Sequence, residues 1–431
     1  MGRAVALPTI TDDSALGGAV IERSLRFDRS DEAYLEATLG NSNLNKWTLS
    51  IWVKKPVNGE HQAILASGDS GVYTMVNFGN SDRLKFTNWH SANKGVYITT
   101  RKFRDTSAWY HIVAIWDSGN STAGDRMRLY VNGVRETEFD QSDNPNQNQD
   151  SIINGNTQGG SDWGEGKHRI GRFSNYADSS GCYYAEVNFV DGQAYDPSYF
   201  GFTESQTNIW MPKRYGGTYG TNGFYLNFST LGETATTMGL DRSGNNHNFT
   251  PTNLEISDFT LDTPSNNFAT LNPLSTSVNT LSQGNLYSTG GGASWRPVSS
   301  NMVMSSGRWY WELYIDTVSS YQIHGIRPQI RDDGDVNHEN DYYPGTYSDE
   351  WGYDGRGYLH NSASPDTSWG NSYAAGDILG FALDMDAGTL NIYKNGSSTG
   401  SQITGISASH SPSGSRGDYL ACFCVYGSTG Q

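Results

Sequence analysis

The chain has 431 residues, of which only 17% are charged and 13% are aromatic. Its 45 acidic residues outnumber its 29 basic residues by 16, a balance that argues against binding to nucleic acid or to anionic membranes. The aromatic content argues against a disordered chain, and the 50 glycines argue against long helices. Short strands joined by polar turns fit this composition best.

The chain begins with residues 1–20, which show no hydrophobic period and are predicted to form an arm, either disordered or docked on a partner. Its first residues are too few and too interrupted by Pro8 to form a signal peptide. No run of 18 apolar residues follows, so the sequence predicts no membrane insertion. The three cysteines cannot build a disulfide framework and are predicted to be small buried hydrophobes.

Short segments that alternate apolar and polar residues fill the region 21–200. One of them leads into Asn132-Gly133, a dipeptide that favours a two-residue hairpin turn because both positions readily adopt positive φ. The predicted strands are 24–28, 47–53, 63–65, 72–76, 83–86, 109–116, 127–131, 168–171 and 183–190, with a polar insertion over 140–166. This spacing predicts an all-β sandwich or barrel.

The next region, 201–275, contains a predicted strand at 223–228 and several prolines, which together indicate an irregular bridge with one or two strands. A second strand series then occupies 276–431. Its clearest members are 309–315, 376–384 and 389–394, the last of which ends in another Asn-Gly turn.

The two strand series of this chain resemble two known protein families. The segments SLRFD, WTLSIWV, WYHIV and LYVNG, followed by EVNFVDGQAYDP at 186–197, resemble the laminin G-like branch of the concanavalin A-like jelly rolls. The segments SGRWYWE, GDILGFALD and GTLNIYKNG resemble SPRY domains, which are also concanavalin A-like. The resemblances imply an all-β fold of two jelly-roll sandwiches in tandem. SPRY domains usually end in a further core strand, so we expect the natural polypeptide to continue beyond Gln431.

The tandem arrangement resembles surface proteins encoded by marine bacteriophages. The resemblance implies a virion component, such as a tail fibre, an adhesin or a capsid fibre, that leaves the host by lysis. The arm would then dock on other virion proteins, and the chain would form a homo-oligomer, with a trimer favoured because fibres are usually trimeric.

Catalysis is not predicted. Glycoside hydrolysis needs two carboxyl groups about 5–9.5 Å apart, and related hydrolases carry Glu-x-Asp-x-x-Glu on one strand. Glu312 and Asp316 have the wrong spacing, and Asp384 and Asp386 flank a hairpin turn. His111 is predicted to be a packed, hydrogen-bonded histidine.

Calcium is the only metal or cofactor that the sequence suggests. An acidic loop contains Asp332, Asp333 and Asp335. Counted from Asp333, its sixth position is His338 rather than the glycine of an EF-hand, and an ordinary solvated loop would account for the same acidic residues. The laminin G-like resemblance implies a calcium site at a sandwich rim, for which Asp28, Asp117 and Asp125 are candidates by position.

Carbohydrate binding is the leading functional hypothesis, because sugars are recognised by aromatic faces and planar polar side chains. Candidate residues, in the polar insertion and in predicted loops, are Trp89, His90, Asn93, Trp163, Tyr342, Tyr343, Tyr347, Trp351 and Tyr353. Each aromatic residue could instead belong to a core. We therefore expect a non-enzymatic virion protein that binds host-surface glycans. Two alternatives stay open, a purely structural decoration of capsid or tail and a polysaccharide depolymerase.

Overall fold

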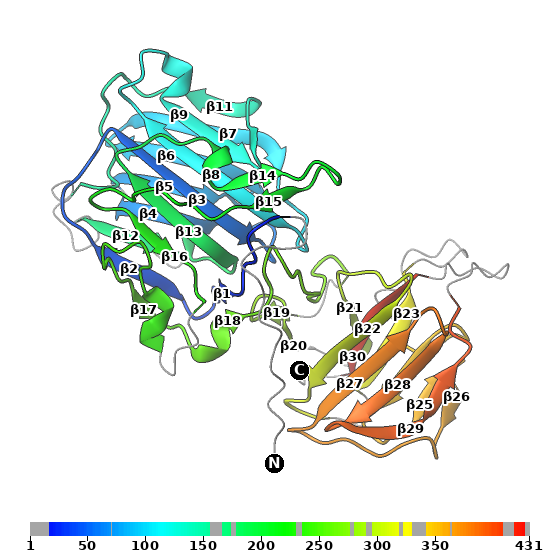
Figure 1. Ribbon diagram of the computed structural model, residues 1–431. Coiled ribbons are helices and arrows are strands. Elements are labelled where there is room, and N and C mark those ends of the chain that lie inside the picture. The colour runs from blue at the N-terminus through cyan, green and yellow to red at the C-terminus, as the bar shows by residue number, and fades with distance from the viewer. Residues whose placement is uncertain are drawn as a thin grey trace. The chain divides into compact units, whose positions relative to one another are not determined.

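The computed structural model describes residues 17–69, 71–155, 166–173, 178–229, 235–275, 280–289, 295–318, 322–329, 342–362, 364–407 and 418–426. The chain divides into two compact units, Met1–Phe268 and Ala269–Gln431 (Figure 1). Among the described residues, the regular secondary structure of each unit is antiparallel strands apart from a few short 3-10 turns, so the predicted all-β fold class is confirmed.

The first unit contains two large sheets. The first sheet has the order β10 (Val134–Arg135), β9 (Met127–Val131), β8 (Trp109–Asp117), β3 (Lys46–Lys54), β13 (Tyr183–Asp191), β1 (Ser24–Arg26) and β18 (Phe259–Thr260), with β16 (Phe224–Leu226) also paired to β13. The second sheet has the order β11 (Phe139–Asp143), β7 (Asn93–Lys102), β6 (Arg83–His90), β5 (Val72–Phe78), β4 (Gln62–Asp69), β12 (Lys167–Ile170), β2 (Tyr34–Thr38) and β17 (Thr250–Thr252). Smaller elements are the pair β14 (Gly201–Thr203) and β15 (Trp210–Pro212), and the 3-10 turns Ala123–Asp125, Pro197–Tyr199, Ala235–Gly239 and Ile256–Asp258.

Aromatic and aliphatic side chains from both sheets form one core in this unit. Trp47 is fully buried, and its ring lies 5.5 Å from that of Phe86 and 5.7 Å from that of Phe189. The predicted hairpin turn is also present, with φ of 48° at Asn132 and 78° at Gly133. The alternating pattern read from the sequence is therefore the pattern of inward and outward side chains.

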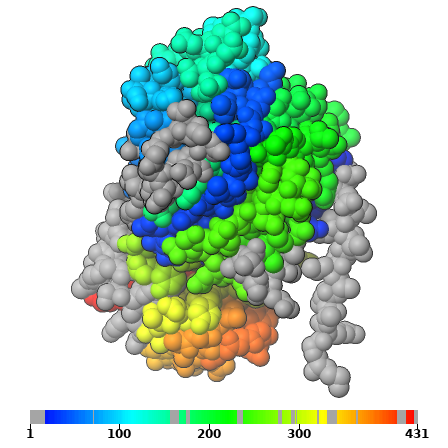
Figure 2. Space-filling model, turned by 90° about the vertical axis from the view of Figure 1, so that its left-hand side faces the viewer, coloured from blue at the N-terminus to red at the C-terminus, as the bar shows by residue number. Residues whose placement is uncertain are grey.

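The structure corrects the predicted bridge over 201–275. Residues as far as Phe268 belong to the first unit, where β16 pairs with β13, β17 with β2 and β18 with β1. Figure 2 shows green residues of this stretch beside blue residues from the start of the chain. The physical reason is that β1 and β2 would otherwise leave unpaired backbone groups. The end of the predicted arm is likewise part of this unit, because the amide of Ala19 donates to the carbonyl of Pro212.

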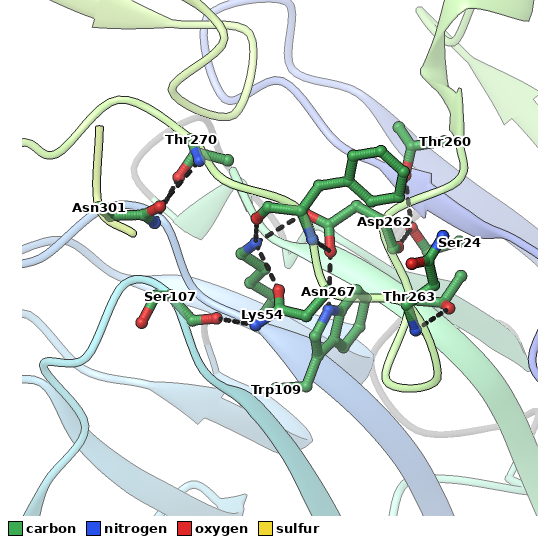
Figure 3. Close-up of polar contacts among 12 residues, drawn as sticks. Ser24, Lys54, Ser107, Trp109, Thr260, Asp262, Thr263, Asn267, Thr270 and Asn301 are labelled. Carbon is green, nitrogen blue, oxygen red and sulfur yellow. Dashed lines mark hydrogen bonds and ion pairs between the residues drawn. The ribbon is translucent and has the colours of Figure 1, made fainter. Parts of the chain in front are cut away.

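A buried lysine anchors the last segment of the first unit (Figure 3). The Lys54 ammonium has no exposed surface and lies 2.6 Å from a carboxylate oxygen of Asp262. It also donates to the side-chain oxygen of Asn267 at 2.9 Å and to the carbonyl of Phe268 at 2.7 Å. The Trp109 indole donates to the other oxygen of Asp262 at 2.9 Å. These charge-assisted bonds fasten residues 262–268 to strands β3 and β8.

The second unit also contains two sheets. One has the order β21 (Trp295–Ser299), β30 (Tyr419–Tyr426), β23 (Ile323–Pro328), β24 (Trp351–Asp354), β25 (Leu359–Asn361) and β26 (Ser364–Asp366). The other has the order β22 (Arg308–Tyr314), β27 (Ile378–Asp384), β28 (Thr389–Lys394) and β29 (Ser397–Thr404), and a hairpin joins β19 (Thr280–Ser282) to β20 (Tyr287–Thr289). Strand β30 is paired on both sides, with β21 and β23. Strand β30 is therefore an interior strand of this sheet.

The three cysteines are free and buried, as predicted. Burial raises the pKa of the Cys182 and Cys422 thiols to about 11, which keeps them protonated and unreactive at neutral pH. The predicted role of His111 is also confirmed. Its ring is fully buried, accepts a hydrogen bond from the Trp210 indole at 2.9 Å and lies 2.9 Å from the Ser50 hydroxyl.

Candidate functional site

The strongest candidate site is a groove on the outer face of the second sheet of the first unit. Strands β5, β6 and β7 are adjacent there, and their register places side chains in three rows. The rows are Tyr73–Trp89–Asn93, Met75–Thr87–Val96 and Asn77–Lys85–Ile98. Alternate residues of these strands, such as Val76 and Phe86, belong to the core, so the three rows face away from it.

The groove encloses about 410 Å³, which is within the size range of small-ligand sites, about 300–1,000 Å³. Its walls come from the three rows, completed by residues from neighbouring segments: His61, Gln141, Phe173 and Asp178. The Tyr73 and Phe173 rings lie 4.9 Å apart, and Trp89 is directly opposite Tyr73 on the adjacent strand. Three aromatic rings thus border one cavity, and such rings can pack against the C–H faces of a sugar.

Polar groups in the groove complement these rings. The side chain of Asn77 is buried, and among the described residues its amide oxygen has no hydrogen-bond partner. The amides of Asn93 and Gln141 are both held by the Asp143 carboxylate, each at 2.6 Å. Planar amides fixed in this way offer donors and acceptors at defined positions for hydroxyl groups.

One acid and one histidine face each other at the groove wall. The Nδ1 atom of His61 lies 3.6 Å from the Asp178 carboxylate. Burial raises the pKa of Asp178, and the nearby positive groups, including Lys85, oppose that rise. Burial and the charge of Asp178 also raise the pKa of the Tyr73 hydroxyl, which therefore remains a hydrogen-bond donor at neutral pH. Asp178 is the only carboxyl group among the described lining residues, whereas glycoside hydrolysis uses two.

Two of the predicted site residues, Trp89 and Asn93, lie in this groove. His90 follows Trp89 on the strand and lines a separate cavity of about 380 Å³ with Asn41, Gln149 and Asp150. Trp163 lies outside the described residues.

In the second unit, two predicted site residues belong to the hydrophobic core instead. Trp351 is 9% exposed and Tyr353 is fully buried. The Tyr353 hydroxyl donates a hydrogen bond to the carbonyl of Asn371. The physical reason is that β24 is an interior strand of its sheet, between β23 and β25. The other three tyrosines lie nearer the surface. Tyr342 is exposed and its ring is 6.1 Å from that of Tyr347, whereas Tyr343 packs between Trp295 and His360.

The aspartates suggested for calcium have other partners. Asp117 contacts Lys46 at 3.5 Å and Arg128 at 3.3 Å. Asp125 contacts an arginine at 2.8 Å, and the Asp28 carboxylate accepts hydrogen bonds from the backbone and hydroxyl of a nearby serine. Within the described part of the chain, no three His, Cys, Asp or Glu side chains are placed to share a metal ion. The loop with Asp332, Asp333 and Asp335 lies outside the described residues.

Several groove residues were not identified from the sequence: Tyr73, Asn77, Gln141, Phe173, His61 and Asp178. One signal was present for the first two. In the segment VYTMVNF, the outward positions carry tyrosine, methionine and asparagine, an aromatic and polar mixture suited to a ligand. The others come from distant segments, which only the folded sheet brings together.

Comparison with known protein families agrees with this architecture. Residues 28–178 match the family described as the concanavalin A-like lectin/glucanases superfamily, and residues 308–429 match the SPRY domain. The SPRY domain of human HERC1 is 21% identical, with 37% of this chain and 92% of that chain covered and a TM-score of 0.29. A putative carbohydrate-binding protein from Bacteroides ovatus is 15% identical, with 54% and 58% covered and a TM-score of 0.36. Domains LG4-5 of the mouse laminin alpha1 chain are 10% identical, with 95% and 83% covered and a TM-score of 0.33.

A comparison with curated protein sequences gave no match. The chain thus carries a laminin G-like, concanavalin A-like domain followed by a SPRY domain. The groove residues all fall within the segment 28–178 that matches the first family. None of the described helices is long and apolar enough to cross a membrane.

Proposed function

We propose that this chain is a non-enzymatic binding protein that holds a carbohydrate in the groove of its first unit. The observation that carries the proposal is the combination of three aromatic rings, Tyr73, Trp89 and Phe173, with fixed amides in one cavity of about 410 Å³. Ring faces would stack on sugar C–H surfaces. The buried amide oxygen of Asn77, which has no partner among the described residues, would accept a hydroxyl hydrogen. Asp178 is the only carboxyl group among the described lining residues, which supports binding rather than hydrolysis.

We further propose that the glycan belongs to a host cell surface and that the protein is part of a phage virion. The support for this step is the resemblance of the tandem domains to surface proteins of marine bacteriophages. Such a protein would act as a homo-oligomer, because several weak sites on one particle raise the effective affinity. The N-terminal arm would then attach it to other virion proteins.

A glycan array tests the binding proposal. Protein coupled to beads, so that weak sites act together, is applied in calcium and again in EDTA. We expect selective binding that falls at least tenfold in Trp89→Ala and in Asn77→Ala. Tyr314→Ala, which removes an exposed aromatic residue in the second unit, is the matched control and should bind like the wild type.

Silence across a broad array, with the fold shown intact by circular dichroism, would overturn the lectin proposal and favour structural decoration. Loss of binding in EDTA would support a calcium ion at the site. Release of sugar fragments from host capsule would instead favour a depolymerase.

A further inference from the structure

The second unit contains a sheet edge that no described strand covers. Strand β22 is the end strand of its four-stranded sheet and pairs along its whole length with β27, from Arg308 opposite Asp384 to Tyr314 opposite Ile378. On its other side, the backbone of β22 makes no hydrogen bond to any described residue. An unpaired edge of seven regular residues, without proline or bulge, is a template for another strand.

A pocket of about 180 Å³ lies along this edge. Five consecutive residues of β22, 309–313, line it, and the opposite wall includes Leu286, Met302, Met304 and Phe423. A cavity of about 150 Å³ with such walls can hold a benzene ring. The pocket therefore has room for one ring-sized or branched side chain.

Two hydrogen-bond donors at this pocket lack acceptors among the described residues. Ser288 is only 3% exposed, and its hydroxyl has no partner among the described residues. The indole N–H of Trp311 is likewise buried without a partner in the part of the chain that the structure describes. Buried polar groups are nearly always satisfied, so these two donors point to an oxygen atom supplied by a bound molecule.

We propose that the β22 edge binds an extended peptide segment of a partner protein, which adds a fifth strand to the sheet. The backbone of this peptide would pair with the free edge of β22, which is how β-strand addition gains affinity. One large apolar side chain would fill the pocket, and an oxygen of the peptide would accept from Ser288 and Trp311. Since side chains alternate along a strand, neighbours of the inserted residue would point elsewhere and could be polar.

The probes are fluorescent heptapeptides of sequence acetyl-Lys-Thr-Thr-X-Thr-Thr-Lys-amide, with X as Phe, Tyr, Leu or Gly, titrated with the full chain in an anisotropy assay. We expect the three large residues to bind at least tenfold more tightly than Gly. Methylation of alternate backbone nitrogens in the Phe peptide should weaken binding at least tenfold, because it removes the donors to β22. If the pocket held the peptide by its side chain alone, without strand pairing, methylation would leave the affinity unchanged.

Two variants and one control test the location of the peptide site. Leu286→Trp, at a half-exposed position on the rim, should block the pocket and lower affinity at least tenfold without unfolding the unit. Ser288→Ala should weaken binding severalfold. Tyr314→Ser, on the exposed face of the same strand, should bind like the wild type. The proposal is overturned if no peptide binds, if affinity does not depend on X, or if Leu286→Trp has no effect.

Discussion

Replacing Lys54 by methionine removes the buried ammonium that fastens residues 262–268 to the first sandwich. The aliphatic part of the side chain is kept, so the change tests charge and hydrogen bonding rather than volume. Three bonds are lost, to Asp262, Asn267 and Phe268. The Asp262 carboxylate stays buried, and it keeps the Trp109 indole as a donor at 2.9 Å and the Phe268 backbone amide as a donor at 3.3 Å.

The expected loss of stability is about 3–5 kcal/mol, the usual effect of leaving one charge of a buried pair without its partner. In a domain of this size, 1 kcal/mol shifts the melting temperature by about 2–4 °C, so the transition of the first unit should fall by about 6–20 °C. Burial lowers the pKa of Lys54 even though Asp262 opposes that shift. The attraction between the two charges therefore does not fully offset the cost of removing the ammonium from water. Lys54→Met combined with Asp262→Asn, which removes both charges, should therefore recover most of the loss.

Differential scanning calorimetry at pH 7 measures these shifts for the wild type, both single variants and the double variant. Lys213→Met is the matched control, because Lys213 is exposed and its ammonium bonds only one carbonyl, at 3.0 Å. We expect the control to change stability by less than about 0.5 kcal/mol. If Lys54→Met melted within 2 °C of the wild type, roughly the effect of 1 kcal/mol or less, the anchoring role of this network would be refuted.

Three further predictions concern stability. Burial lowers the pKa of His111 to about 3 and of His168 to about 4, so the unfolded chain binds protons first as the pH falls below about 6.5. The contribution of each histidine to stability should be constant above that pH and drop by about 2 kcal/mol by pH 5. Burial raises the pKa of Glu186 to about 7, which acts in the opposite direction, so the test uses Glu186→Gln, and a flat urea midpoint of this variant between pH 7 and 5 would contradict the prediction. Gly133→Ala places a methyl group 2.3 Å from the Trp210 ring at a φ of 78°, so calorimetry should show a loss of about 1–3 kcal/mol; unchanged stability would mean that the ring moves freely. Trp351→Ala should destabilise the second unit by about 3–5 kcal/mol and leave glycan binding unchanged, whereas reduced binding by a folded variant would restore this residue as a site candidate.

Local patterns were enough to predict the fold class and many of the strands, although β2 and β7 were missed and β11 lies largely in the segment predicted as a polar insertion. The segment 47–53 alternates because one of its faces meets the main core, and it forms β3. The segment 109–116 is continuously apolar because it meets the main core on one face and two smaller hydrophobic clusters on the other, and it forms β8. Asn132-Gly133 predicted its turn because positive φ is a property of the two residues themselves. These signals lie within a few residues of each other, so they can be read without knowing the rest of the chain.

The groove was only partly predictable. Trp89 and Asn93 combine an aromatic ring with an amide near a strand end, and both lie in the groove. Phe173 and Asp178 come from a distant segment, and their place beside Tyr73 depends on the lateral order of strands. Strand order follows from long-range pairing, for which a single sequence carries no local signal.

What the sequence determined by itself was therefore the class of fold, the turns and the chemistry of a few exposed side chains. Only the tertiary structure decided that Trp351 and Tyr353 lie in a core and that residues 201–268 complete the first sandwich. In both cases the physical reason is the same. Whether a side chain is buried, and whether a backbone edge is paired, depends on which distant strand lies beside it.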